Sequence, residues 1–287
     1  MDTRTKSLAA LCGLCVMAAT LMCGAPAFGQ AATGAGQGAA AAQDAPKPVD
    51  PHEAFWQSRN PYEKSLVEQR YTDWGFLAKY RDADRELGEP EAGVTRVVFM
   101  GDSITEAWGM KATASSPGRG EFFPGKPYVN RGISGQTSPQ MLVRFRQDVI
   151  DLKPKVVVIL AGTNDIAENT GKMTQGETGN NIASMSELAR ANGIRVVLCS
   201  VLPASEFWWH KGLEPAPKVR ALNAWIKDYA TKNGLVYVDY YSPMVNAEGG
   251  LKKELSPDGV HPNVAGYAEM APLAEAGIAE ALKKPLS

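Results

Sequence analysis

The chain has 287 residues, of which 44% are hydrophobic. This length can bury one sizeable core and does not require two large domains. The formal net charge of −1 supplies no strong field of the kind that attracts nucleic acid or an anionic membrane surface. The composition therefore indicates a near-neutral globular protein and argues against nucleic acid as a partner.

The N-terminus has the pattern of an export signal. Arg4 and Lys6 precede an apolar run at residues 8–22, which is too short to span a bilayer comfortably. Ala25-Pro26-Ala27 then fits the small-x-small pattern of a signal peptidase site. We expect residues 1–27 to be a cleaved signal peptide. The mature protein is expected to be periplasmic or secreted, with no stable membrane insertion after cleavage.

The cysteines agree with export and leave one alternative open. A lipoprotein signal ending at Cys23 is that alternative, although Met22 is large where such a signal has a small residue. Removal of the signal would leave Cys199 as the one cysteine of the mature chain, so no internal disulfide is expected. Cys199 lies in an apolar run and is interpreted as a small core residue rather than a nucleophile.

Composition divides the rest of the chain into three parts. Residues 28–50 are mostly Ala, Gly, Gln and Pro, which cannot bury enough apolar surface to order a chain, so a disordered linker is expected. Residues 51–92 scatter aromatic side chains among charges and are interpreted as an N-terminal helical extension. Residues 93–287 form the expected main domain.

Strand and helix patterns alternate through the main domain. Short apolar runs predict strands at residues 96–100, 128–130, 156–161, 195–201 and 235–239. Apolar residues at three- and four-residue spacing predict helices at residues 139–150, 177–191, 218–232 and 263–282. Such alternation implies an α/β fold in which a parallel sheet carries helices on both faces. Ligands of such sheets bind at the carboxyl ends of the strands.

Gly101-Asp102-Ser103 follows the first predicted strand and leads into a probable helix start. At a helix N-terminus, free backbone N–H groups point toward an incoming anion. Ser103 is therefore placed to attack a carbonyl while its own N–H stabilises the oxyanion. Helix capping by Asp102 or Ser103 is the simpler explanation of the tripeptide taken alone.

A serine nucleophile needs a base, and the sequence has three histidines: His52, His210 and His261. His52 lies near the predicted linker, and His210 follows two tryptophans in a predicted loop. Asp258 precedes His261 by three residues, close enough for the carboxylate to hold the imidazole tautomer. A turn followed by a helix cap would also explain this spacing, but the pair is the best candidate for base and orienting carboxylate.

Two more strand ends carry candidate donors for an oxyanion. Asn164 follows the third predicted strand in Gly162-Thr163-Asn164-Asp165, and its amide can donate a hydrogen bond. Gly135 lies in the loop after the second strand and can offer an unobstructed backbone N–H. Individually these segments are ordinary loops. Together, four strand ends bring a nucleophile, two donors and an orienter–base pair to one edge of the sheet.

These four blocks resemble those of the GDSL-type, or SGNH, hydrolase family of esterases and lipases. Gly101-Asp102-Ser103 matches the nucleophile block, with Ile104 where many members have Leu. Gly135, Asn164 and the Asp258/His261 pair match the other three blocks, in the family's order. The match is most similar to lysophospholipase-L1-like and platelet-activating-factor-acetylhydrolase-like bacterial members.

The resemblance implies a fold and a set of roles. It implies a three-layer, flavodoxin-like fold with five parallel strands in the order 2-1-3-4-5. It also implies an oxyanion hole made by Ser103, Gly135 and Asn164. No cofactor is expected, and no metal, because the histidines are scattered and supply no ligand cluster. The G-x-S-x-G elbow of the α/β-hydrolase fold is absent around Ser103.

Several residues near these blocks are candidates for substrate contact. Trp208, Trp209 and His210 follow the fourth predicted strand and can form an aromatic wall, or can pin a loop to the body of the protein. Trp108 lies about one turn beyond Ser103, and Asp102 adjoins it. No long apolar lid or sustained lipid-binding stripe follows, which disfavours a long-chain lipase.

The sequence therefore predicts a serine ester hydrolase that removes small O-acyl groups, above all acetyl, from an ester that is small or part of a carbohydrate. Within catalysis, the alternatives are a lysophospholipase- or thioesterase-type acylhydrolase and an acyltransferase. A non-catalytic carbohydrate-binding module on the same scaffold is the alternative from another class. The residue pattern favours the enzyme, because all the elements of a nucleophilic mechanism are present.

Overall fold

A computed structural model of the chain describes residues 53, 57, 61–114 and 117–286. The predicted signal peptide and linker lie outside the described residues. The chain divides into two units after Glu53, and the fold described below is that of the second unit. Among the described residues, no helix has both the length and the apolar character needed to cross a membrane.

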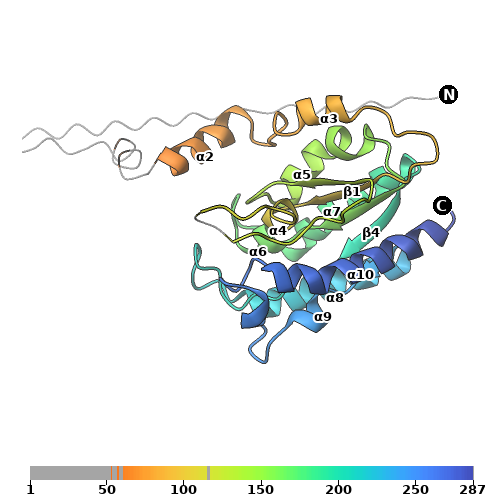
Figure 1. The fold of residues 1–287 in the computed structure, drawn as a ribbon. Helices are drawn as coiled ribbons and strands as arrows, with labels where there is room; N and C mark the ends of the chain where they lie inside the picture. The colour runs from red at the N-terminus through yellow and green to blue at the C-terminus, as the bar shows by residue number, and fades with distance from the viewer. Residues whose placement is uncertain (1–52, 54–56, 58–60, 115–116, 287) are drawn as a thin grey trace, which may run out of the picture. The chain divides into compact units, whose positions relative to one another are not determined.

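Five parallel strands form the central sheet, in the order β2-β1-β3-β4-β5 (Figure 1). This order confirms the one implied by the family resemblance. The strands are β1 (Val97–Gly101), β2 (Tyr128–Gly132), β3 (Val156–Leu160), β4 (Arg195–Cys199) and β5 (Val236–Val238). Every residue of β1 and β3 is buried, as expected for central strands covered on both faces.

The long predicted helices are present, with shifted ends. They are α5 (Ser138–Phe145), α7 (Gln175–Ala191), α8 (Pro215–Lys232) and α10 (Val264–Lys283). The segment after α5 differs from the prediction, because residues Arg146–Ile150 continue as a π-helical turn rather than an α-helix. The other helices are α2 (Pro61–Thr72), α3 (Arg81–Leu87), α4 (Ser103–Glu106), α6 (Thr163–Ile166), α9 (Tyr241–Met244) and the 3₁₀ turn at Lys253–Leu255.

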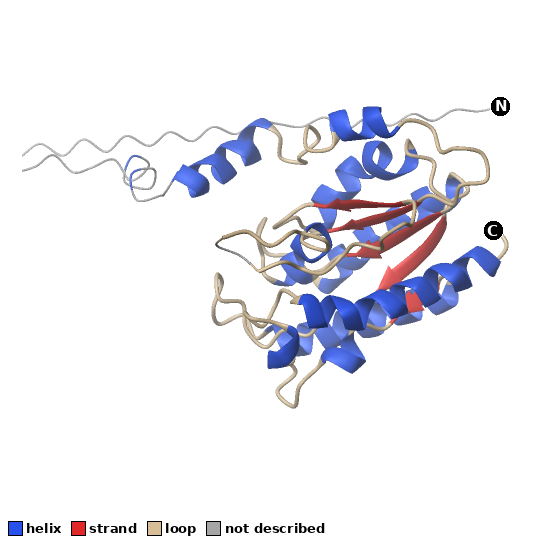
Figure 2. Cartoon of the chain, in the orientation of Figure 1, coloured by secondary structure: helices blue, strands red, loops and turns tan. Residues whose placement is uncertain are grey.

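Alternating side chains of the strands build a separate core on each face of the sheet. Val97 and Phe99 of β1 belong to the cluster covered by α10. Val98 and Met100 belong to the cluster covered by α5, α7 and α8. The sheet is thereby enclosed between two layers of helices, as Figure 2 shows, and the α/β architecture predicted from the sequence is confirmed.

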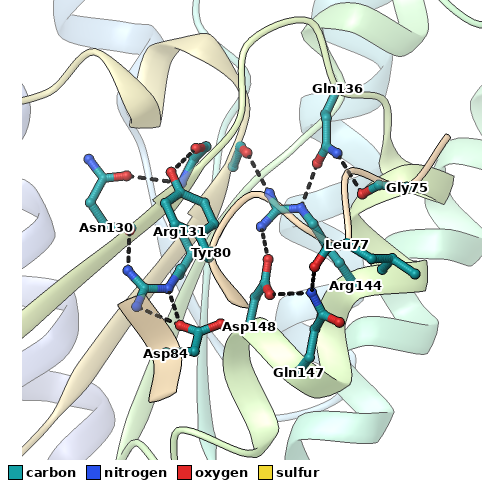
Figure 3. Close-up of polar contacts among 12 residues, drawn as sticks. Gly75, Leu77, Tyr80, Asp84, Asn130, Arg131, Gln136, Arg144, Gln147 and Asp148 are labelled. Carbon is teal, nitrogen blue, oxygen red and sulfur yellow. Dashed lines mark hydrogen bonds and ion pairs between the residues drawn. The ribbon is translucent and has the colours of Figure 1, made fainter. Parts of the chain in front are cut away.

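Three glutamine side chains of the main domain hold the segment between α2 and α3. The Nε2 group of Gln136 donates to the carbonyl oxygen of Gly75 at 3.0 Å, and that of Gln147 donates to Leu77 at 2.8 Å (Figure 3). Gln140 makes the same kind of bond to Trp74 at 2.7 Å. These bonds satisfy backbone carbonyls of an irregular segment, so residues 74–77 pack as part of the same unit as the sheet.

Arg144 is the centre of a buried polar network behind the sheet edge (Figure 3). Its side chain is 0% exposed and forms an ion pair with Asp148, also 0% exposed, at 2.8 Å. Its other nitrogens donate to Gln136 Oε1 at 2.6 Å and to the carbonyl oxygen of Gly101 at 3.1 Å. The network thus joins the end of β1 to the loop after β2, which are two of the strand ends named above.

We predict that Arg144→Ala strongly destabilises the fold. The substitution leaves the Asp148 carboxylate buried without its cation, and breaking a buried ion pair in this way costs about 3–5 kcal/mol. Urea unfolding would measure the loss. Arg146→Ala is the matched control, since Arg146 is exposed two residues away and surface changes stay within about 0.5 kcal/mol. A similar small effect for both variants would show that the network does not stabilise the fold.

Candidate active site

The predicted site residues lie where the strands of the sheet end. Ser103 begins α4 directly after β1, Gly135 lies in the loop after β2, and Asn164 lies in α6 after β3. Parallel strands bring these ends to one edge of the sheet. Asp258 and His261 reach the same edge from the loop that precedes α10.

Local packing explains why the turn at Ser103 has its sequence. A Cβ atom on Gly101 would lie 2.0 Å from Thr105 Oγ1, so only glycine allows α4 to fold back so closely on the end of β1. Asp102 then caps α4, and its Oδ1 accepts from the backbone N–H of Ile104 at 2.9 Å. Ser103 is the first helical residue, and such N–H groups have no intrahelical partner.

The structure brings Ser103, His261 and Asp258 together in one chain of hydrogen bonds. Ser103 Oγ lies 2.9 Å from His261 Nε2, across a sequence separation of 158 residues. His261 Nδ1 lies 2.7 Å from Asp258 Oδ2. An ionised carboxylate can only accept, so the proton belongs on Nδ1 and the lone pair of Nε2 faces the hydroxyl. This is the arrangement needed for a base to take the proton of Ser103.

Hydrogen bonds hold the Asp258 carboxylate in its ionised form. Its Oδ1 accepts from the backbone N–H of His261 at 2.8 Å and from that of Val260 at 3.0 Å. Partial burial alone would raise the pKa of Asp258. The hydrogen bonds from His261 and Val260 outweigh burial and hold the pKa of this carboxyl well below its usual range. Asp258 therefore remains charged throughout the pH range in which an imidazole titrates.

Asp102 is fully buried rather than exposed to a substrate. Its side chain is 0% exposed, and its Oδ2 lies 3.3 Å from Asn164 Nδ2. Burial raises the pKa of Asp102 to about 6, although the N–H of Ile104 and the nearby His261 oppose the shift. The expectation of a substrate contact is therefore corrected, because Asp102 supports α4 and Asn164 from within.

Two of the three predicted oxyanion donors, Gly135 and Asn164, differ in their hydrogen bonding. Gly135 adopts a φ of 75°, and its N–H donates to no other described residue. The amide nitrogen of Asn164 donates to the carbonyl oxygen of Gln136 at 3.0 Å and, over the longer 3.3 Å, to Asp102. Of these two contacts, the one to Asp102 is the longer.

The aromatic candidates separate into a core residue and a loop. Trp108 is 4% exposed and packs edge-to-face on Phe99, with ring centroids 6.1 Å apart; it is part of the core, so the expectation that it contacts substrate is corrected. Trp208 is 60% exposed. Trp209 is half-buried, and the exposed His210 places Nδ1 2.8 Å from the carbonyl oxygen of Ala167.

A cavity of about 350 Å³ adjoins the loop that carries Gly135. Glu106, the last residue of the α4 turn that begins with Ser103, is one of its walls. The remaining lining comes from residues Ile133, Ser134, Gln140, Arg70, Phe76 and Lys79. The N-terminal helical segment thus contributes to a surface beside the predicted site.

Sequence reasoning missed Asn169, which lies between the two oxyanion candidates. Its Nδ2 donates to Asn164 Oδ1 at 2.8 Å and to the carbonyl oxygen of Gly135 at 3.3 Å. Its Oδ1 accepts from Trp209 Nε1 at 2.9 Å. The one signal in the sequence is a second asparagine five residues after Asn164, which a loop residue alone would also explain.

A hydroxyl, an imidazole and an ionised carboxylate in series at a sheet edge form the arrangement of a serine hydrolase. The described residues contain no group of histidine, cysteine and acidic side chains that could hold a metal ion. Residues 99–269 match the family model of the GDSL-like lipase/acylhydrolase family. The chain belongs to this family, which confirms the resemblance noted from its four blocks.

Three relatives illustrate the similarity. The crystal structure of a GDSL-like lipase from Bacteroides thetaiotaomicron is 46% identical, with a TM-score of 0.67, and covers 73% of this chain and 100% of its own. Esterase TesA of Pseudomonas aeruginosa is 28% identical over 61% of this chain and 83% of its own length. An acetylxylan esterase of Xylanibacter ruminicola is 26% identical over 68% of this chain. The chain spans between 45% and 83% of the lengths of its curated relatives.

We predict that a fluorophosphonate labels Ser103 and that the rate of labelling falls as the pH is lowered. Protonation of His261 places a hydrogen on Nε2, which then cannot accept the proton of Ser103. Asp258 has a depressed pKa and adds no loss between pH 5 and pH 8. Mass spectrometry of the labelled protein between pH 5 and pH 8 would measure the rate.

Asp102→Asn is the control for this experiment, since burial raises the pKa of Asp102 to about 6, inside the pH range of the measurement. A pH dependence that persists in this variant belongs to His261. A labelling rate that does not change with pH, in the wild type or in the control variant, would contradict the assignment of His261 as the base.

Proposed function

We propose that this protein is an exported esterase that hydrolyses small O-acyl esters, acetyl above all, with a carbohydrate as the preferred alcohol. The observation that carries the proposal is the hydrogen-bonded series of Ser103 Oγ, His261 Nε2, His261 Nδ1 and Asp258 Oδ2, with steps of 2.9 and 2.7 Å. Export is proposed because residues 1–27 have the pattern of a cleaved signal.

Catalysis proceeds through an acyl-enzyme. Ser103 Oγ attacks the ester carbonyl while His261 Nε2 takes the hydroxyl proton, and Asp258 stabilises the imidazolium that forms. The tetrahedral intermediate collapses, the carbon–oxygen bond to the alcohol breaks, and the imidazolium gives its proton to the departing alcohol. Water then repeats the sequence against the acyl-enzyme, releasing the carboxylic acid and restoring Ser103.

Three donors stabilise the negative oxygen of each tetrahedral intermediate. The Ser103 N–H suits this role because it lies at a helix N-terminus. The Gly135 N–H suits it because it has no other partner among the described residues. The Asn164 amide supplies the third when its long contact to Asp102 at 3.3 Å gives way to the oxyanion. Such donors act on the transition state more than on the ester, so they raise kcat.

The charged lining of the cavity beside Gly135 favours a substrate whose alcohol part is polar. Arg70, Lys79 and Glu106 place charged groups around it, and Lys79 is paired with Glu106 at 2.9 Å. A sugar satisfies such groups with hydroxyls, whereas a long acyl chain leaves them unpaired. The acetylxylan esterase relative agrees with this substrate class. Acyl transfer to a sugar acceptor in place of water uses the same residues.

We predict that hydrolysis of p-nitrophenyl esters is fastest with acetyl and falls as the acyl chain lengthens from two to twelve carbons. Acetylated xylo-oligosaccharides should release acetate, and the products formed with an added sugar acceptor would report any transfer. Ser103→Ala should remove nearly all turnover while the circular dichroism spectrum is retained. Preference for chains of eight or more carbons would overturn the acetyl assignment in favour of a lysophospholipase- or thioesterase-type activity.

We further predict that Asn164→Ala lowers kcat by about 10²–10³, the usual cost of losing one oxyanion donor. KM for p-nitrophenyl acetate should change little, because the lost bond forms mainly in the transition state. Steady-state kinetics on the purified variant would measure both constants. A kcat within threefold of the wild type would remove Asn164 from the oxyanion hole.

A further inference from the structure

The indole of Trp209 makes a polar contact behind the proposed oxyanion hole. Its Nε1–H lies 2.9 Å from Asn169 Oδ1. An indole nitrogen can only donate a hydrogen bond. The oxygen of the Asn169 amide must therefore face Trp209, and the nitrogen of that amide must face the opposite way.

The orientation of the Asn169 amide in turn constrains the orientation of the Asn164 amide. Asn169 Nδ2 donates to Asn164 Oδ1 at 2.8 Å. The oxygen of the Asn164 amide is thus held on the side of Asn169, and its nitrogen is directed toward Asp102 and the turn that carries Ser103. The donor-only indole therefore favours the same direction of both amides as the carbonyl oxygens of Gly135 and Gln136, which can only accept.

The Asn169 amide also fixes the second donor of the hole. Its nitrogen reaches the carbonyl oxygen of Gly135 at 3.3 Å, so one side chain bridges the asparagine and the glycine of the predicted oxyanion hole. Hydrogen bonds in series polarise one another, and donation to Asn164 Oδ1 makes the opposite N–H groups of Asn164 better donors. Neither effect requires Asn169 to touch the substrate.

The anchoring of the aromatic loop suits Trp209 to this role. Phe207 is 0% exposed, and its ring centroid lies 5.0 Å from that of Trp209. The indole is therefore held against the protein core rather than free in the cleft. This explains why the two adjacent tryptophans differ in exposure: Trp208 is 60% exposed, whereas Trp209 is half-buried against Phe207.

We propose that Trp209 and Asn169 are positioning residues of the oxyanion hole, an indole-to-amide relay that keeps the N–H groups of Asn164 directed at the reacting carbonyl. The proposal rests on the proposed function, since it assigns Asn164 to the oxyanion. It gives a role in catalysis to Asn169, which no motif in the sequence singled out, and changes the expected role of Trp209 from substrate wall to support.

Two conservative substitutions test the relay. Trp209→Phe keeps an aromatic ring and removes the indole N–H. Asn169→Asp keeps the shape but replaces the donor that faces Asn164 with an acceptor. We expect each to lower kcat for p-nitrophenyl acetate about five- to tenfold, the effect of one lost or misdirected hydrogen bond, with KM within twofold of the wild type. The rate of fluorophosphonate labelling at Ser103 should fall in parallel.

The Asn164→Ala background separates positioning from general destabilisation. If the relay acts through Asn164, adding Trp209→Phe or Asn169→Asp to Asn164→Ala should lower the labelling rate by less than twofold further. Trp225→Phe and Asn180→Asp are matched controls, because Trp225 stacks on Tyr229 in α8 and Asn180 is exposed in α7. Both controls should retain wild-type rates.

The proposal would be overturned by full activity in both relay variants, or by an equal further loss in the Asn164→Ala background. Failure of the proposed function gives a different result. In that case the wild type does not hydrolyse acetyl esters, while fluorophosphonate labelling still reports whether the relay affects Ser103.

Discussion

The hydrogen bond between Ser103 and His261 depends on how α10 is held against α4. The two residues are 158 positions apart in the chain. A second hydrogen bond between α10 and α4 helps to hold them at this distance. The hydroxyl of Tyr267, 2% exposed in α10, donates to the carbonyl oxygen of Ile104 at 2.7 Å. Ile104 follows the nucleophile and Tyr267 follows the base by six residues, so a buried bond near each partner sets their separation.

The opposite side of the nucleophile is held by a different set of interactions. Arg144 bonds both the carbonyl oxygen of Gly101 and the side chain of Gln136, while the backbone carbonyl of Gln136 accepts from Asn164. The position of the loop after β2 relative to Ser103 is therefore set by a buried cation rather than by apolar packing. Directed bonds suit this purpose, because apolar contacts tolerate small shifts that a catalytic geometry does not.

Periodicity and turn residues predicted much of this structure, and the misses have physical causes. The five strands and four long helices were predictable because each buries a regular apolar pattern. Asp258 and His261 were identifiable because they lie three residues apart. Trp108 was misassigned because sequence distance from Ser103 does not reveal that its side chain turns into the core. Asn169 was missed because its contacts are with residues in loops after three different strands.

The raised pKa of Asp102 shows that this side chain lowers the stability of the fold while it holds α4 and Asn164 in place. A carboxyl that is 0% exposed and titrates at about 6 is protonated more readily in the folded protein than in the unfolded chain. The contribution of Asp102 to stability is therefore greatest below the unfolded pKa of about 4 and is lost as the pH rises through 6, where the folded state must carry a buried charge. An apolar residue would avoid this cost but could not accept from the N–H of Ile104 and the amide of Asn164 together. The destabilising carboxylate lies where it serves as the shared acceptor for the first turn of α4 and for the amide of Asn164.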